Sequence, residues 1–202
     1  MKAKKPFFLH RANRKTVTKV LILALATPII LSSPAGTRVL TRQLGRELTK
    51  RLSNREDERL SPENVRQTLY KIKSKGYYRP VIKPNGRTRF ELTIKGERLL
   101  KEYQFADMGP VRPVRWDGRW HFVSFDIPQK ASYARDIFRD KLKRMGFFQV
   151  QQSLWVYPYE CKREIDFIID FLHIERYVFV FRTTIEEDKR LREYFQKRGF
   201  EL

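Results

Sequence analysis

The sequence predicts an α+β protein of two domains, an N-terminal winged helix-turn-helix followed by a ferredoxin-like βαββαβ domain. Its 202 residues suit two small domains, each with a core of its own. A helix with chemically marked ends precedes a hairpin whose turn contains Asn85-Gly86. Beyond residue 117, patterns typical of strands and helices alternate in the order strand, helix, strand, strand, helix, strand.

The positive charge of the chain is concentrated in its first half. Residues 1–104 hold 25 Lys and Arg against 8 Asp and Glu, which is +17 of the total net charge of +20. Because neutralising phosphates releases condensed counterions, such a half is where a polyanion docks, and we expect double-stranded DNA as the partner. The alternative is a basic surface that only keeps the protein soluble. Cys161 is the only cysteine, which excludes an intrachain disulfide and a site of paired thiolates.

The first 31 residues allow two interpretations. Residues 1–14 form a basic tail without periodicity, and the apolar run at 20–31 predicts a buried helix from Thr16 to Ala26 that Pro28 closes. A basic segment before an apolar run also resembles a secretory signal, which is the alternative. The run is too short to span a bilayer, which needs about 20 residues, so we expect no membrane anchor and a cytoplasmic protein.

The winged helix is expected to occupy residues 15–104. Ser33 and Pro34 mark the start of its second helix, whose leucines recur every four residues up to Leu48, and a charged loop follows at 53–59. The third helix begins at Ser61 and Pro62 and ends at Gly76.

The outer face of the third helix carries side chains that can read DNA. Val65, Leu69 and Ile72 form its apolar face. The opposite face presents Asn64, Gln67, Tyr70 and Lys71. Amide side chains can pair with adenine edges and lysine with guanine or phosphate, so this pattern predicts a recognition helix. The alternative is an ordinary amphipathic surface helix.

Residues 77–94 predict the wing, two short strands joined at 83–86. Lys83, Arg87 and Arg89 cluster around its tip, where they can meet phosphates or a narrow minor groove. A last helix from Thr93 closes the domain near Gln104, and residues 105–117, with two prolines and a glycine, are predicted to be a linker.

Residues 118–202 predict the ferredoxin-like domain. The expected elements are a strand at 120–127, a helix at 131–145, strands within 147–157, a helix at 160–173, a strand at 177–181 and a last helix that opens with a capping box at 184–187. Val123 and Phe125 alternate with Trp120 and Phe122, so both faces of the first strand are apolar. Since helices cover only one face of the sheet, we expect the other apolar face to be buried in a homodimer or against the winged helix.

The runs 116–128 and 146–158, with the arginine-bearing helix between them, resemble the central domain of PaaX-type transcriptional repressors. That domain is similar to CRISPR-associated protein two, a small nuclease subunit. The resemblance implies a dimer that binds operator DNA and releases it on binding an acyl-coenzyme A effector. Members of the family continue into a further C-terminal domain, which we expect to be missing beyond Leu202, so the small-molecule effector is left unknown.

Asp126 carries the enzymatic alternative, a metal-dependent nuclease or an accessory protein of CRISPR adaptation. The resemblance places Asp126 where the CRISPR subunit has its metal-binding aspartate, and two such carboxylates across a dimer axis can hold Mg²⁺. Otherwise we expect no cofactor. In the competing interpretation, Asp126 caps the turn at Pro128 or pairs with Arg135. Ser153 also matches the family pattern, but we expect it to support the strand.

Overall fold

The computed structural model describes residues 17–26, 29–32, 37–52, 61–85, 87–110 and 115–202. The chain divides into two compact units, with the boundary in the sequence between Asp107 and Met108, and we describe each by itself. Both contain helices and an antiparallel sheet, so the α+β prediction is confirmed. The expected tail at 1–14, the helix start at Ser33 and Pro34 and the loop at 53–59 lie outside the described residues. Within those residues, every helix is too short or too polar to cross a membrane.

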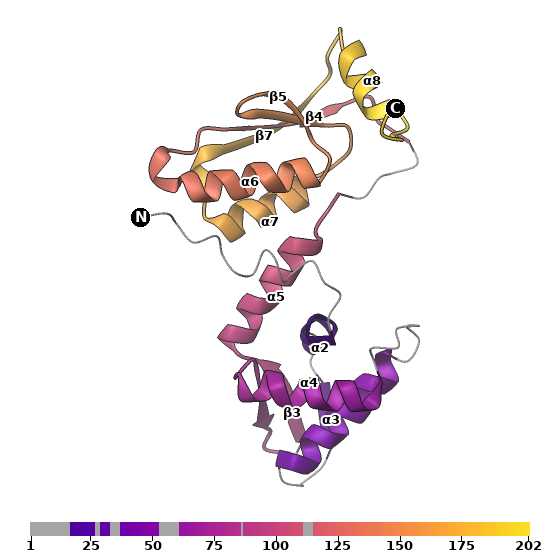
Figure 1. Ribbon diagram of the computed structural model, residues 1–202, viewed down its shortest axis with the longest axis vertical. Coiled ribbons are helices and arrows are strands. Elements are labelled where there is room, and N and C mark those ends of the chain that lie inside the picture. The colour runs from indigo at the N-terminus through magenta and orange to yellow at the C-terminus, as the bar shows by residue number, and fades with distance from the viewer. Residues whose placement is uncertain (1–16, 27–28, 33–36, 53–60, 86, 111–114) are drawn as a thin grey trace. The chain divides into compact units, whose positions relative to one another are not determined.

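The first unit surrounds a three-stranded sheet. Its elements are α2 (Val17–Leu25), β1 (Ile29–Ser32), α3 (Thr37–Leu52), α4 (Pro62–Ser74), β2 (Tyr78–Ile82), β3 (Arg87–Leu92) and α5 (Ile94–Asp107) (Figure 1). The strand order is β1-β3-β2, and both neighbouring pairs are antiparallel. Strand β1 was not predicted. It follows Pro28 directly and pairs Ile29 with Phe90.

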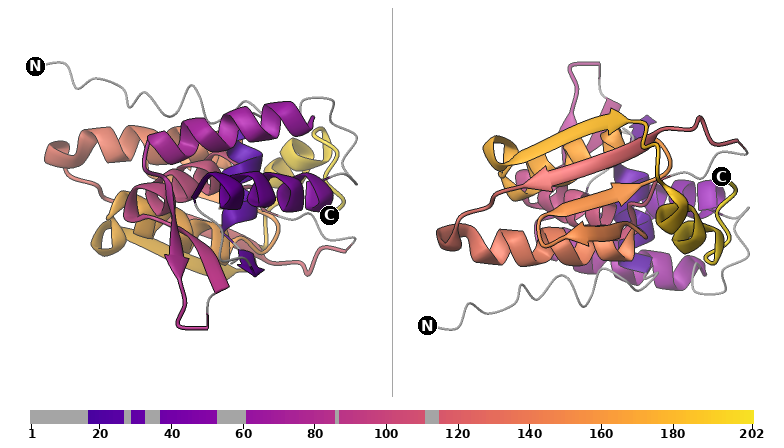
Figure 2. Two further views of the ribbon diagram at one scale, coloured as in Figure 1. Left: turned by 90° about the horizontal axis from the view of Figure 1, so that it is seen from below. Right: turned by 90° about the horizontal axis from the view of Figure 1, so that it is seen from above.

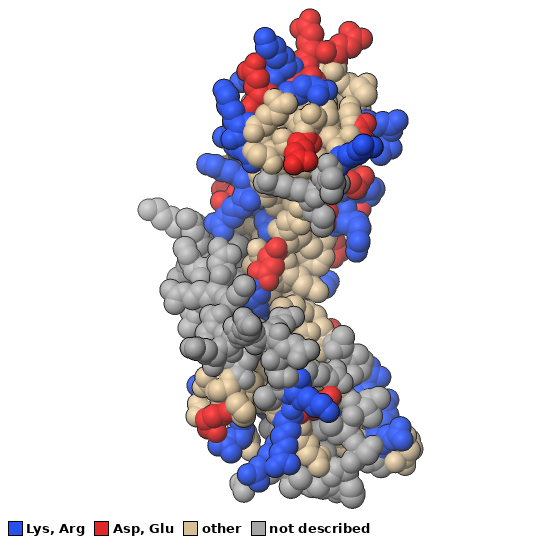
Figure 3. Space-filling model, turned by 90° about the vertical axis from the view of Figure 1, so that its right-hand side faces the viewer, with Lys and Arg blue, Asp and Glu red and all other residues tan. Residues whose placement is uncertain are grey.

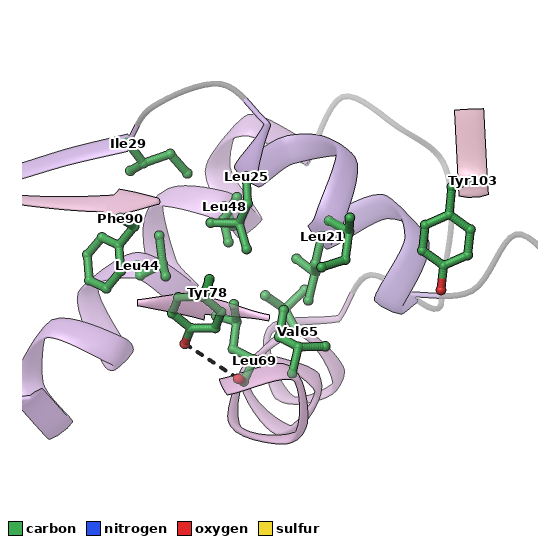
Figure 4. Close-up of a cluster of buried hydrophobic side chains, with 12 residues drawn as sticks. Leu21, Leu25, Ile29, Leu44, Leu48, Val65, Leu69, Tyr78, Phe90 and Tyr103 are labelled. Carbon is green, nitrogen blue, oxygen red and sulfur yellow. Dashed lines mark hydrogen bonds between the residues drawn. The ribbon is translucent and has the colours of Figure 1, made fainter. Parts of the chain in front are cut away.

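The core of the first unit takes side chains from each of these elements. The buried residues are Leu21, Ile22, Leu25, Ile29, Leu44, Leu48, Val65, Leu69, Ile72, Tyr78, Phe90 and Tyr103 (Figure 4). The Tyr78 hydroxyl donates to the carbonyl oxygen of Leu69 over 3.4 Å, which joins β2 to α4. Helix α5 continues beyond the expected end at Gln104, because Phe105 is buried and the Lys19 ammonium pairs with the Asp107 carboxylate. Burial of one face of α4 leaves its polar face outward.

The second unit contains a four-stranded sheet. Its main elements are β4 (Trp120–Phe125), α6 (Ser132–Arg144), β5 (Phe148–Gln151), β6 (Leu154–Tyr157), α7 (Lys162–Leu172), β7 (Val178–Thr183) and α8 (Lys189–Gln196). Short 3₁₀ helices lie at Gln129–Ala131 and Glu175–Tyr177. The strand order is β5-β6-β4-β7, and all neighbouring pairs are antiparallel. Helices α6 and α7 cover one face of this sheet, and α8 lies beside one of its ends (Figures 1 and 2).

The last helix begins later than the capping box at 184–187 predicts. Helix α8 starts at Lys189, and Asp188 is its N-cap. The Asp188 carboxylate accepts hydrogen bonds from Trp120 Nε1 at 3.0 Å and from Arg192 Nε at 2.7 Å. These two bonds lower the pKa of Asp188 and tie the helix start to β4. A tertiary contact therefore sets this boundary.

Candidate nucleic-acid interface

Helix α4 has the ends that its sequence predicts. The Ser61 hydroxyl accepts a hydrogen bond from the backbone N–H of Asn64 at 3.3 Å, and Pro62 takes the first helical position. At the other end, Gly76 has a φ of 71° and its N–H donates to the carbonyl of Lys73. Glycine tolerates this left-handed conformation without the steric cost of a Cβ. Local chemistry therefore fixes which side chains α4 presents.

The four predicted reading residues of α4, Asn64, Gln67, Tyr70 and Lys71, are exposed. One of them is already engaged, since Gln67 Nε2 donates to the Glu63 carboxylate over 2.9 Å. Arg66 Nη2 donates to the same carboxylate over 2.6 Å. The bonds from Gln67 and Arg66 lower the pKa of Glu63. Glu63 and Arg66 were not among the predicted residues, although their spacing to each other and to Gln67 is that of helical neighbours.

The hairpin of β2 and β3 holds two of its three predicted cations at the tip. The Lys83 N–H donates to the carbonyl of Arg87 over 2.8 Å, and the Arg87 N–H donates to Asn85 Oδ1 over 3.2 Å. Both side chains are exposed, and Ile82 beside them is 75% exposed. Gly86 itself lies outside the described residues.

Arg89 differs from the other two cations. It lies further along β3 in the centre of the sheet, with Val81 on one neighbouring strand and Ile30 on the other. Its Nε is 3.1 Å from Glu91 Oε1 on the same strand. The structure therefore separates Arg89, which has an ionic partner, from the cations at the tip.

A further group of cations lies on α3, for which the sequence analysis predicted only the apolar repeat. Arg42, Arg46 and Lys50 share one side of the helix and line a pocket together with the first turn of α4. Their spacing of four residues could have revealed a common side, but not the element that it faces. Lys and Arg side chains are prominent on the visible face of this unit, in the lower part of Figure 3. Asp and Glu side chains are visible among them on both units.

Asp126 is exposed just beyond β4, and its backbone N–H donates to the carbonyl of Tyr177 at 2.9 Å. Across the described ranges, its carboxylate has no hydrogen bond or ion pair. The expected partner Arg135 donates instead to Gln129 Oε1 at 3.3 Å. Ser153 lies between β5 and β6, and its carbonyl oxygen accepts a hydrogen bond from the N–H of Phe125 at 3.0 Å.

The described residues of the chain do not assemble a metal site around Asp126. Nowhere among them do three His, Cys, Asp or Glu side chains gather as a metal would need. Mg²⁺ is usually held by one or two carboxylates together with waters, so a site built from two Asp126 carboxylates across a dimer axis stays a prediction. We therefore derive no metal-dependent step from this position.

The sheet face opposite α6 and α7 is apolar, as the alternation on β4 predicts. Phe122 stacks on Phe181 of β7, with ring centroids 5.2 Å apart and planes 9° apart. In register with them lie Val156 of β6 and Phe148 of β5. Phe179 follows on β7 and is 71% exposed, while Phe181 is 47% exposed. The second unit thus carries large apolar rings that its own residues cover only in part.

Comparison with known proteins finds one family that this second unit resembles. No curated protein matches the chain. Residues 113–195 match the family described as the PaaX protein central Cas2-like domain. The matched segment begins before β4 and ends within α8, so it contains the whole sheet and both helices on its covered face. The second unit is therefore similar to the central Cas2-like domain of PaaX proteins, the resemblance that its sequence carries.

Proposed function

We propose that the protein is a PaaX-type transcriptional regulator, a repressor that binds double-stranded DNA in the cytoplasm. The observation that carries this proposal is the exposed polar face of α4 beside a hairpin with cations at its tip. The element order α2, β1, α3, α4, β2, β3, α5 supports a winged helix-turn-helix over residues 17–107. In that arrangement α4 is the recognition helix, and the hairpin is the wing.

The residues of the two elements take different roles in this proposal. Asn64 and Lys71 on α4 read base edges in the major groove, where amides suit adenine and lysine suits guanine. Gln67 reads bases after its amide leaves Glu63, or through its carbonyl oxygen while the bond to Glu63 stays intact. Lys83 and Arg87 contact phosphates, which adds affinity for any sequence. Similarity of the second unit to a domain of PaaX proteins supports assigning this binding to regulation.

We propose that the second unit forms the dimer. Its open sheet face exposes Phe179 and Phe181, and contiguous exposed apolar surface of this kind marks an interaction site. A two-fold interface uses the same patch on both copies and therefore needs no second complementary surface. Two recognition helices related by that axis would bind the two halves of a palindromic operator.

The test is recovery of DNA from fragmented genomic DNA by the full chain in the presence of EDTA, followed by sequencing. We expect intact fragments that share a palindromic motif, whose half-sites are lost when Asn64 is replaced by alanine. Recovery without a shared sequence would contradict the proposal. Cleavage of the fragments in Mg²⁺ that Asp126→Ala abolishes would instead favour a nuclease.

A further inference from the structure

Helix α3 has two faces of opposite character. Leu44 and Leu48 are fully buried in the core of the first unit. Arg42, Arg46 and Lys50 are exposed and follow one another at intervals of four residues. At 100° per residue, these three cations point away from the leucines and form one stripe along the helix. We call Arg42, Arg46 and Lys50 the α3 stripe.

The α3 stripe borders a pocket of about 460 Å³ between α3 and α4. Its other lining residues are Gly45 of α3 and Pro62, Glu63 and Arg66 of α4. Four cations and one carboxylate therefore line this hollow. The Glu63 carboxylate is held by Arg66 and Gln67, whereas Arg42 and Arg46 have no hydrogen-bonding or ionic partner among the described residues.

We propose that this pocket binds phosphate groups of the duplex backbone at the edge of the groove that α4 enters. The inference rests on the proposed function, because α4 must face DNA for its first turn to reach that edge. Guanidinium groups bind phosphate through two parallel N–H donors. Arg42 and Arg46 have no hydrogen-bonding or ionic partner among the described residues. No contact between those residues therefore has to break before the two arginines bind a phosphate.

Glu63 sets where in the pocket the phosphate lies. The ordinary pKa of a glutamate is already below neutral pH, and the bonds from Gln67 and Arg66 lower it further, so the carboxylate is ionised and repels a phosphate from the α4 side. The phosphate therefore lies against Arg42 and Arg46. A small phosphorylated ligand would satisfy the same donors, and the experiment has to separate it from DNA.

The test compares two double variants of the full chain with equal loss of charge. Arg42→Ala with Arg46→Ala removes two cations of the α3 stripe, whereas Arg98→Ala with Lys101→Ala removes two exposed cations of α5 in the same unit. Dissociation constants for a recovered operator duplex are measured across a range of salt concentrations, and thermal unfolding checks that each variant folds. Each lost phosphate contact lowers the slope of log affinity against log salt by about 0.9.

We expect the stripe variant to lose between about 1 and about 2 from that slope, and the α5 variant to retain it. Replacing Arg42 and Arg46 by lysine should restore most of the slope, because the positive charge returns although the two parallel N–H donors of the guanidinium do not. A stripe variant whose slope equals that of the α5 variant overturns this inference and leaves the proposed function intact. Failure of the unaltered protein to bind duplex overturns both.

Inorganic pyrophosphate, titrated against the side-chain N–H signals of Arg42 and Arg46 in an NMR spectrum, tests the other source of phosphate. We expect shifts only at high millimolar concentration, as for weak contact with single phosphates. Saturation in the micromolar range, together with an unchanged salt slope for the stripe variant, would assign the pocket to a small phosphorylated ligand and overturn the assignment to DNA.

Discussion

Replacement of Phe179 by aspartate should separate the proposed dimer into monomers. The Phe179 ring is 71% exposed on β7, next to Phe181, whose ring stacks on Phe122. A phenylalanine offers about 200 Å² for burial, so this ring offers roughly 140 Å² to a partner, equivalent to about 3.5 kcal/mol. A two-fold interface buries it in both copies, which doubles the loss to about 7 kcal/mol, or roughly a 10⁵-fold rise in the dissociation constant.

Sedimentation over a series of protein concentrations measures this change. Ile94→Asp is the matched control, because Ile94 is 83% exposed at the first position of α5 in the other unit. The Ile94→Asp variant should keep the thermal unfolding midpoint of the unaltered protein, whereas the Phe179→Asp variant should unfold at a lower midpoint that no longer depends on protein concentration, because it has lost the stabilisation that dimerisation gives. A monomeric unaltered protein, or a Phe179→Asp variant that dimerises as tightly as Ile94→Asp, would refute the reasoning.

Four further predictions concern single residues. Arg87→Ala should lower the salt slope of duplex binding by about 1 and leave site preference unchanged, as measured by salt-dependent affinity for operator and mismatched duplexes. Gly96→Ala should cost about 3 kcal/mol of unfolding free energy in urea titration, because a Cβ there would lie 1.9 Å from the carbonyl oxygen of Tyr77. Burial raises the pKa of Cys161 to about 12, so a thiol reagent at mildly alkaline pH should label it only after unfolding. Burial lowers the pKa of His121 below 6.5, so the unfolded chain binds a proton that the folded chain does not. The free energy of unfolding should therefore fall as the pH decreases through about 6.5, and less so in His121→Gln.

The ends of α4 were predictable from the sequence, because the residues that set them act locally. Ser61 accepts a bond from a backbone N–H three residues away, and Gly76 adopts its own positive φ. Strand β1 was not predictable in this way. Its four residues follow a proline and show no alternation, and it is a strand because Ile29 pairs with Phe90, about sixty residues further along the chain. The register of that pairing depends on the whole first unit.

The candidate interface shows the same division between local and tertiary information. Exposure of Asn64, Tyr70 and Lys71 followed from helical periodicity. The bond from Gln67 to Glu63 spans four residues of one helix, so it could have been predicted from the spacing in the sequence. The position of the α3 stripe could not be predicted from the sequence. Its spacing defines one side of α3, but only the fold places α4 against that side.

The two units expose opposite kinds of surface, and this difference separates the two proposals experimentally. In the proposals, Arg42, Arg46, Lys83 and Arg87 of the first unit contact phosphates, so their removal should change the salt slope and leave sedimentation unaltered. The Phe179 ring carries no charge, and we propose that it lies in the dimer interface. Its replacement should therefore weaken binding to a palindrome, because a monomer contacts only one of the two half-sites. Binding of that variant to a single half-site should keep the affinity and salt slope that the unaltered protein has for the same half-site. If Phe179→Asp instead altered the slope on a half-site, the sheet face would itself contact DNA, and the dimer would have to form elsewhere.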